Sequence, residues 1–435
     1  MQREARRPGE PLPLGGREAP GEGETPPRVV MLMRQFHPIR GGYENQALRL
    51  AEEMQKAGLA VDVVTLRHPG LAAFEVHRGI PIHRLRVVGK KHVVAVSYLV
   101  AAFGWMARRR RRFDLIHANR STSGLIAGLI GFVLRKPVLY KLTRGDEVDK
   151  KGLRGRGLGA LKTACLRRTV DRFVAITSGM EDDLRALGVP GAKIVRIPNG
   201  IELPPRADRS EARAALGIDR ESSVVTFVGR LISEKGVDWL LEAWTDIAAT
   251  EPGACLLIVG DGPERPRLEA ASVRLGVTAS VRFLGHRNDV DQILSASNVF
   301  VLPSRLEGVS NALLEAMAHE LAVIVGDDIL GGNREVVRHD VDGLVVPADD
   351  RRGLAEAIHR VLRDEALRSR LAAVAREAVC ERFSIASVAA RYRALYQELL
   401  ASQPDPDGAR ALSRAVGDAH PASLGHRWTS PRSRK

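Results

Sequence analysis

Aromatic residues and cysteines are scarce in this chain. Phe, Trp and Tyr together make up 4% of the 435 residues, and there are three cysteines, Cys165, Cys255 and Cys380. The cysteines are far apart, have apolar neighbours and match no metal-binding spacing. We therefore interpret them as core residues of a reduced, cytosolic protein. No aromatic platform for stacking nucleic-acid bases is evident, so we expect no nucleic-acid partner.

The chain also lacks an apolar run of the roughly 20 residues that cross a bilayer. The nearest is Val93–Ala107, which is followed by five arginines, Arg108–Arg112. Two interpretations are compatible with each other. The stretch packs as a helix whose cationic end suits its dipole, or it lies on an anionic membrane with its arginines among lipid headgroups. The first 27 residues contain no apolar core segment, so we expect no signal peptide.

Positive charge is concentrated in the first half of the chain. Residues 28–200 hold 32 Lys and Arg against 13 Asp and Glu, a net charge of +19, and residues 201–400 hold 24 against 31, a net charge of −7. Such a basic half predicts an anionic partner, such as an acidic substrate or an anionic membrane surface. The alternative is that these cations are solvated side chains on the protein surface and bind no particular partner.

Short apolar strands alternate with helical stretches between two tails, residues 1–27 and 403–435, which are too polar to order themselves. The first series of predicted strands is Val29–Met33, Val61–Thr65, Leu115–His117, Val138–Leu142, Phe173–Ile176 and Ile194–Ile197. The second series is Val224–Val228, Leu256–Val259, Val281–Leu284, Val299–Leu302, Ala322–Val325 and Leu344–Val346. This alternation predicts an α/β fold with parallel sheets covered by helices on both faces.

The segment Glu307–Glu315 carries the strongest functional signal. It follows Val299–Pro303, a predicted buried strand that runs into a loop. Ser310 or Asn311 can cap the helix that follows, so unpaired backbone N–H groups would point toward Glu307. Because amides bind phosphate and carboxylates bind sugar hydroxyls, the segment suits a ligand that carries both groups.

Four motifs, which follow one another along the chain in the family's order, resemble those of retaining glycosyltransferase family 4. Glu307 and Glu315 stand in a run similar to the family's E-G-x-x-N-A-L-L-E-A-M-A. The others are Gly229–Gly236, similar to G-R-L-x-x-E-K-G, Gly331–Glu335, similar to G-G-x-x-E, and Pro198–Ile201, similar to P-N-G-V/I. The likeness extends from about residue 29 to about residue 400.

The resemblance implies the GT-B architecture, two Rossmann-like domains that face each other across a cleft. We accordingly predict an acceptor-binding domain at residues 28–203 and a nucleotide-sugar-binding domain at residues 204–383. A last helix at residues 384–402 would cross back onto the first domain. The implied reaction moves a hexose-type sugar, with retention of configuration, from a nucleotide-diphosphate sugar to a glycan or lipid-linked acceptor. A cytoplasmic protein, peripheral at the inner face of the plasma membrane, would fit this reaction.

The resemblance also implies roles for single residues. Glu307 would bind hydroxyls of the donor sugar, Glu315 the ribose, and the backbone near Arg287 the nucleobase. Phosphate or sugar oxygens would meet the backbone of a short run, Gly308, Val309, Ser310, Asn311 and Ala312.

Two cations and two glycines complete the predicted donor site. Arg230 and Lys235 lie on a loop that follows a strand and opens a helix, which suits the binding of a diphosphate. Cations already in place stabilise the charge that develops on a departing diphosphate, so we assign catalysis to them and to Glu307. Gly41 and Gly42 follow the first strand, where glycines let amides approach a phosphate. A simple tight turn would explain these glycines equally well if they stood alone.

One family residue is missing. Many members carry a histidine in the loop after the strand near residue 140, whereas this chain has Lys141, Arg144, Asp146 and Asp149 in and after that strand. One of these four would replace the positioning role of the histidine, or the chain has lost activity. We interpret His117, at an earlier strand end, as structural.

No cofactor beyond the sugar nucleotide is expected, and no metal, because Arg230 and Lys235 already supply positive charge. Two other functions stay open. The first is a non-hydrolysing sugar-nucleotide epimerase, which would share the diphosphate grip. The second is a catalytically inactive, membrane-associated partner of another transferase.

Overall fold

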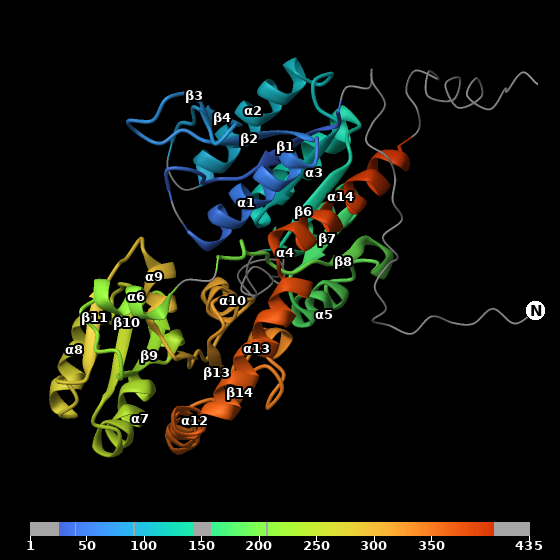
Figure 1. The fold of residues 1–435 in the computed structure, drawn as a ribbon. Coiled ribbons are helices and arrows are strands. Elements are labelled where there is room, and N and C mark those ends of the chain that lie inside the picture. The colour runs from blue at the N-terminus through green and yellow to red at the C-terminus, as the bar shows by residue number, and fades with distance from the viewer. Residues whose placement is uncertain (1–25, 40, 90–91, 143–157, 206–207, 404–435) are drawn as a thin grey trace, which may run out of the picture.

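The computed structural model describes residues 26–39, 41–89, 92–142, 158–205 and 208–403. These residues form two sheets, each with helices on both faces (Figure 1). The chain completes one sheet before it begins the other, as the succession from blue to yellow and orange shows in Figure 1. The prediction of an α/β fold with two Rossmann-like sheets is confirmed.

The first sheet has eight strands in the order β3-β4-β2-β1-β5-β6-β7-β8. They are β1 (Arg28–Leu32), β2 (Ala60–Leu66), β3 (Phe74–His77), β4 (Ile80–Leu85), β5 (Leu115–Asn119), β6 (Val138–Lys141), β7 (Arg172–Ala175) and β8 (Ile194–Arg196). The helices between them are α1 (Gly42–Lys56), α2 (His92–Arg108), α3 (Ser121–Leu134), α4 (Leu158–Thr169), α5 (Ser178–Ala186) and the 3₁₀-helix η2 (Gly191–Lys193).

The apolar strands are buried because helices cover both faces of this sheet. Successive side chains of a strand point to opposite faces, so Val30 and Leu32 of β1 pack on one side, and Val29 and Met31 on the other. Helices α2, α3, α4 and α5 supply the first side, and α1 supplies the second. Continuous apolar runs of this kind are what a parallel sheet requires.

The second sheet has six parallel strands in the order β11-β10-β9-β12-β13-β14. They are β9 (Ser223–Val228), β10 (Ala254–Val259), β11 (Val281–Gly285), β12 (Val299–Leu302), β13 (Ala322–Asp327) and β14 (Leu344–Pro347). Around them lie α6 (Arg209–Ala215), η3 (Ser233–Lys235), α7 (Val237–Thr250), α8 (Arg265–Arg274), α9 (Val290–Ala296), α10 (Asn311–Ala318), α11 (Gly332–Val336), α12 (Arg351–Arg363) and α13 (Glu365–Arg382).

The last helix returns to the first sheet. Helix α14 (Ile385–Ala401) follows α13 with a short break and runs alongside α1 (Figure 1). Its buried Val388, Tyr392, Leu395 and Leu399 recur every three or four residues and pack in the core beside β1. Helix α14 therefore covers the part of this sheet face that α1 leaves uncovered.

Two features depart from the sequence reading. Strands β3 and β4 were not predicted, and β3 pairs antiparallel with β4, so the first sheet is not wholly parallel. These two strands alternate apolar with polar residues at one side of the sheet, which gives a weaker strand signal than the continuous apolar runs of the buried strands. The three cysteines are free thiols, as expected, but they are only half-buried rather than in the core.

Candidate active site

The Glu307–Glu315 segment forms a loop that enters α10. Ser310 is the N-cap, and its Oγ accepts a hydrogen bond of 3.4 Å from the N–H of Leu313. The remaining amides of the first turn are left for another partner, which makes this helix end a site for an anion. Glu315 lies at the start of the second turn of the helix.

Lys235 and Glu307 meet at this helix end. Nζ of Lys235 donates a hydrogen bond to Oε1 of Glu307, and Oγ of Ser304 donates to the same oxygen at 3.3 Å. Both side chains are largely buried, with 18% and 11% of their surface exposed. Arg230 stands on the same loop as Lys235, is exposed, and forms no ion pair with any residue that the structure describes. The structure thus brings the predicted Lys235 and Glu307 together and leaves the Arg230 guanidinium available.

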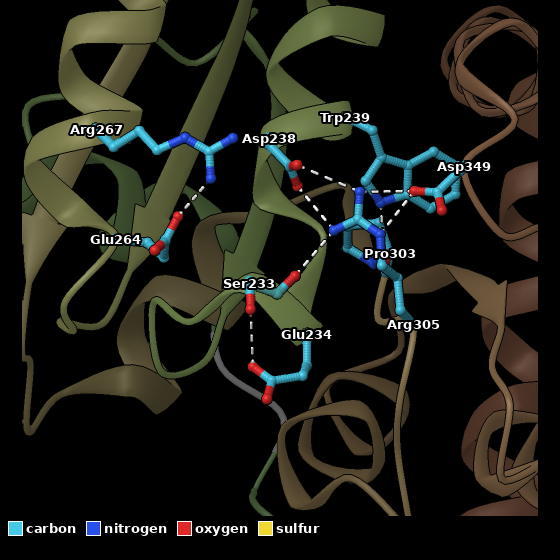
Figure 2. A network of polar contacts seen from close by, with 9 residues as sticks. All are labelled: Ser233, Glu234, Asp238, Trp239, Glu264, Arg267, Pro303, Arg305 and Asp349. Carbon is cyan, nitrogen blue, oxygen red and sulfur yellow. Dashed lines mark hydrogen bonds and ion pairs between the residues drawn. The ribbon is translucent and has the colours of Figure 1, made fainter.

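Arg305 fastens the two loops that carry these residues. It donates hydrogen bonds to both carboxylate oxygens of Asp238, at 3.0 and 3.2 Å, and to Asp349 at 2.7 Å (Figure 2). It also donates to the carbonyl of Ser233 at 2.8 Å, on the turn that carries Lys235. Burial by itself lowers the pKa of Arg305, but the hydrogen bonds to Asp349 and Asp238 outweigh it and raise that pKa.

A buried carboxylate joins the G-G-x-x-E turn to the Glu307 loop. Asp328 accepts hydrogen bonds from the backbone N–H groups of Glu307 at 3.2 Å and of Asn333 at 2.8 Å. Burial raises the pKa of Asp328, and the backbone donors counteract this shift. The approach is close enough that a Cβ on Gly332 would lie 1.7 Å from the carbonyl oxygen of Gly308.

Gly42 brings the first domain against the same helix end. Its carbonyl accepts a hydrogen bond of 3.3 Å from Nδ2 of Asn311, the first residue of α10. Gln46, one turn further along α1, donates to Oδ1 of Asn311 at 3.0 Å and to the carbonyl of Gly200 at 2.7 Å. Gly41 is the N-cap of α1, and a Cβ there would collide with the Glu44 carboxylate. The predicted glycines therefore lie beside the predicted phosphate-binding amides.

An ion pair between the domains involves Glu315. Arg49 of α1 contacts its Oε1 at 3.1 Å, and about a quarter of each side chain is exposed. Burial raises the pKa of Glu315, and Arg49 counteracts this shift. A cavity of about 640 Å³ opens beside this pair, between residues 202–205 with Asp208 and the side of α9 that carries Asp291 and Ser295.

Arg287 is the predicted residue that the structure does not join to the others. Its guanidinium pairs with Asp289 at 2.5 and 2.8 Å, within its own loop. Its side-chain hydrogen bonds reach no residue of the Glu307–Glu315 segment in the described part of the chain. Helix α9 begins three residues after Arg287 and borders the cavity beside Glu315.

Lys141 is buried at the carboxyl end of β6. Its amine donates to Oδ1 of Asn199 at 3.2 Å and lies 5.6 Å from the centre of the Tyr392 ring. Asn199 in turn donates to Oδ1 of Asn311 at 3.3 Å. Burial lowers the pKa of Lys141 to about 8. The lysine thus reaches α10 through Asn199, whereas Arg144, Asp146 and Asp149 lie outside the described residues.

His117 is a core residue, which agrees with its interpretation as structural. Its Nδ1 lies 2.7 Å from the hydroxyl of Tyr396, and its ring stacks on Tyr392. Burial, with a smaller contribution from Lys141, lowers its pKa to about 3. The ring is therefore neutral and bound to α14 at any physiological pH.

Sequence reasoning missed Gln46 and Arg49. They follow Gly42 by four and seven residues, the spacing that puts them on one face of α1. This spacing was readable from the sequence, but the partner of that face was not. It also missed three buried polar groups near the carboxyl ends of β1 and β5, which have an atom without a hydrogen-bond partner in the described structure: Glu44, Asn119 and Ser123.

Sequence profiles of two families match the chain. Residues 41–200 match the profile described as glycosyl transferase 4-like domain, and residues 222–364 match glycosyl transferases group 1. The 2-deoxystreptamine N-acetyl-D-glucosaminyltransferase of Streptomyces fradiae is 30% identical over 350 residues, 73% of this chain and 81% of that one. The chain belongs to the group 1, GT4-like glycosyltransferases. It is a glycosyltransferase that uses nucleotide sugars.

Two further comparisons place this glycosyltransferase among known proteins. The UDP-Gal:alpha-D-GlcNAc-diphosphoundecaprenol alpha-1,3-galactosyltransferase of Escherichia coli is 28% identical over 271 residues, 60% of this chain and 69% of that one. The structure of sucrose-phosphate synthase from Thermosynechococcus elongatus superposes with a TM-score of 0.74 at 25% identity, over 86% of this chain and all of that one. The predicted family and GT-B fold are confirmed.

The described part of this glycosyltransferase contains no group of His, Cys, Asp and Glu suited to holding a metal ion. Within the same ranges, no helix has both the length and the apolar character needed to span a membrane.

Proposed function

We propose that this glycosyltransferase moves a hexose-type sugar from a nucleotide-diphosphate sugar to a lipid-linked or glycan acceptor, with retention of configuration. The observation that carries the proposal is the arrangement at the start of α10. Lys235 is paired with Glu307, Arg230 is available, and the uncapped amides of the helix face the same place. This arrangement suits a ligand that carries a diphosphate next to a hydroxylated sugar.

In the proposed reaction, the bond between the sugar's anomeric carbon and the diphosphate breaks. Negative charge then grows on the departing phosphate, where Arg230, Lys235 and the amides of Val309, Ser310, Asn311 and Ala312 stabilise it without having to reorganise. The acceptor oxygen bonds to the same face of the anomeric carbon, and its proton passes to an oxygen of the leaving phosphate. No side-chain base is needed, which is consistent with the missing histidine.

Lys141 takes the histidine's positioning role only indirectly in this proposal. Its amine is fixed beneath the domain interface and holds Asn199, which holds Asn311 at the start of α10. Glu315 would bind the ribose, and the cavity of about 640 Å³ beside it has room for the rest of the nucleoside. The acceptor would enter at the carboxyl edge of the first sheet, near Glu44 of α1 and Asn119 of β5.

A lipid-linked acceptor is favoured by the +19 charge of residues 28–200, and by the diphosphoundecaprenol in the name of the Escherichia coli relative. A protein at the inner face of the plasma membrane would meet such an acceptor.

Thermal stability in a panel of sugar nucleotides tests the donor site. A ligand at about 100 times its dissociation constant adds about 2.7 kcal/mol to stability, so a true donor raises the Tm measurably. We expect this shift in the wild type and its loss in Glu315→Ala and Arg230→Ala. Arg267→Ala, which removes an exposed arginine paired with Glu264, is the matched control and should keep the shift.

Absence of a shift with every sugar nucleotide would contradict the proposal and favour an inactive partner of another transferase. Interconversion of a free sugar nucleotide without any acceptor would indicate the epimerase instead. Analysis of the product's anomeric linkage then tests retention, because an α-linked donor must give an α-linked product.

A further inference from the structure

The outer side of α2 is apolar along its length. Val93, Val96, Val100 and Phe103 follow one another at intervals of three or four residues, and 56%, 61%, 65% and 38% of their surfaces are exposed. On the opposite side, Tyr98 and its neighbours are buried against the first sheet. A helix that is apolar all round usually has an apolar environment on every side, yet the described structure covers only one side of α2.

The neighbouring helices extend this exposed surface. Helices α2, α3 and α4 pack in that order on one face of the first sheet, so their outer sides point away from it together. We use the term apolar face for the exposed apolar side chains of these three helices, which are Val93, Val96, Val100, Phe103, Leu129, Phe132, Val133 and Leu161. No aspartate or glutamate occurs in α2, α3 or α4. Contiguous exposed apolar surface of this kind marks an interaction site.

Arginines border the apolar face at one end. We use the term arginine rim for the arginines at or just after the C-terminal ends of the three helices, which are Arg108–Arg112, Arg135, Arg167 and Arg168. All are exposed except Arg109, whose guanidinium lies 4.6 Å from the centre of the Trp105 ring. The helices run antiparallel to the strands, so the rim lies at the edge of the sheet opposite the donor site.

We propose that the apolar face and the arginine rim dock this protein onto an anionic lipid surface. Apolar side chains would enter the boundary between headgroups and acyl chains, while the arginines meet lipid phosphates. The charge pattern favours lipid over a second copy of the chain, because the three helices offer no carboxylate with which another copy's arginines could pair. It also fits the excess of positive charge in the first half of the chain.

The docked orientation would serve the reaction. The N-terminal ends of α2 and α3 follow the carboxyl ends of β4 and β5, on the edge of the sheet that faces α10. An acceptor lipid at this end of the docked apolar face, away from the arginine rim, would have its headgroup beside the donor site. This step rests on the proposed function, whereas the docking itself does not.

Flotation with lipid vesicles tests the docking without any sugar nucleotide. We expect the protein to float with vesicles of phosphatidylcholine and phosphatidylglycerol at low ionic strength, and less with phosphatidylcholine alone. Each arginine near an anionic surface contributes about fivefold to partitioning, so Arg110→Glu with Arg111→Glu should lower it by about 25-fold or more. Val96→Glu with Val100→Glu should also abolish flotation, and both positions are exposed enough to tolerate the change.

Matched controls lie on the second domain. Val273→Glu changes a valine of α8 that is 68% exposed, and Arg274→Glu reverses the exposed arginine beside it. Both should float like the wild type. The proposal is overturned if the wild type does not float, if the α2 variants float as well as the controls, or if salt has no effect.

Light scattering distinguishes docking onto lipid from docking onto a second copy of the chain. A wild-type dimer that Val96→Glu with Val100→Glu converts into monomers would show a contact between copies and contradict lipid docking. The sugar-nucleotide shift in Tm is measured on the same variants. A variant that keeps this shift but no longer floats separates the failure of docking from the failure of the donor site.

Discussion

Glycine decides how closely the loops of the proposed donor site approach each other. At Gly332 the neighbouring backbone is the carbonyl of Gly308, in the loop that carries Glu307, and a Cβ would lie 1.7 Å from its oxygen. At Gly331, one residue earlier, a Cβ would meet nothing within 4 Å, although φ is +68°. Two adjacent glycines therefore serve different needs, close packing at one and a left-handed backbone at the other.

These two glycines give a matched pair of variants. Gly332→Ala must push the Glu307 loop away, at a cost of about 1–3 kcal/mol as for other overpacked sites. We expect it to weaken sugar-nucleotide binding as well as stability. Gly331→Ala should cost only the strain of a left-handed alanine, about 1–2 kcal/mol, with binding kept. Chemical denaturation and ligand titration measure both, and equal loss of binding in the two variants would contradict the argument.

Among the elements, η3 with the start of α7 and the loop after β12 are held as one unit. Arg305 joins them through Asp238 and the carbonyl of Ser233, and Nε1 of Trp239 donates to the carbonyl of Pro303 at 2.8 Å (Figure 2). The loops themselves carry Lys235 and Glu307. Their relative position is thus set by a planar guanidinium that makes several hydrogen bonds at once.

Arg305→Lys should separate these loops. A lysine keeps the charge but cannot span Asp238 and Asp349 together, so hydrogen bonds to charged groups worth about 1.5–3 kcal/mol each are lost or weakened. We expect lower stability and a lower kcat. Arg267→Lys, at the exposed pair with Glu264 in the same view, should change stability by about 0–1 kcal/mol. Unchanged turnover in Arg305→Lys would show that the clamp does not position the site.

In the whole molecule, the two domains meet around α10. Gln46 and Asn199 hold Asn311, Arg49 holds Glu315, and Glu335 accepts a hydrogen bond of 2.8 Å from the backbone N–H of Ser178 at the start of α5. Most of these contacts are polar and partly exposed. Interfaces of this character permit domain movement, which a nucleotide could use to enter and leave.

Arg49→Gln should give nucleotide binding a stronger pH dependence. In the proposed donor site, ribose binding would use ionised Glu315, and burial already raises the pKa of this carboxyl against the effect of Arg49. Without Arg49 the pKa rises further, so the carboxylate is lost at a higher pH as the solution is acidified. Ligand titrations from neutral to acidic pH should show the acid limb displaced upward. Gln46→Leu removes an uncharged contact of the same interface and should leave that limb in place.

The strands and the local parts of the site could be predicted from the sequence. Val-rich runs that end in glycine loops form buried parallel strands wherever they lie in such a chain, because their apolar side chains must be covered on both faces. Lys235 and the amides of α10 also follow from local sequence, since each lies within one strand–loop–helix unit. The family motifs located Glu307 and Glu315 for the same reason. Only β3 and β4 were not predicted. The edge strand β3 depends on its antiparallel pairing with β4, which is a tertiary contact.

Tertiary structure alone decided which distant groups meet. Gln46 and Asn311 are 265 residues apart and touch only because α1 and α10 face each other across the domain interface. Arg49 reaches Glu315, and Lys141 reaches Asn199, through the same packing. The sequence shows which side chains share one helix face or one strand end. It cannot show what covers that face, because the covering surface is set by the summed packing of both domains.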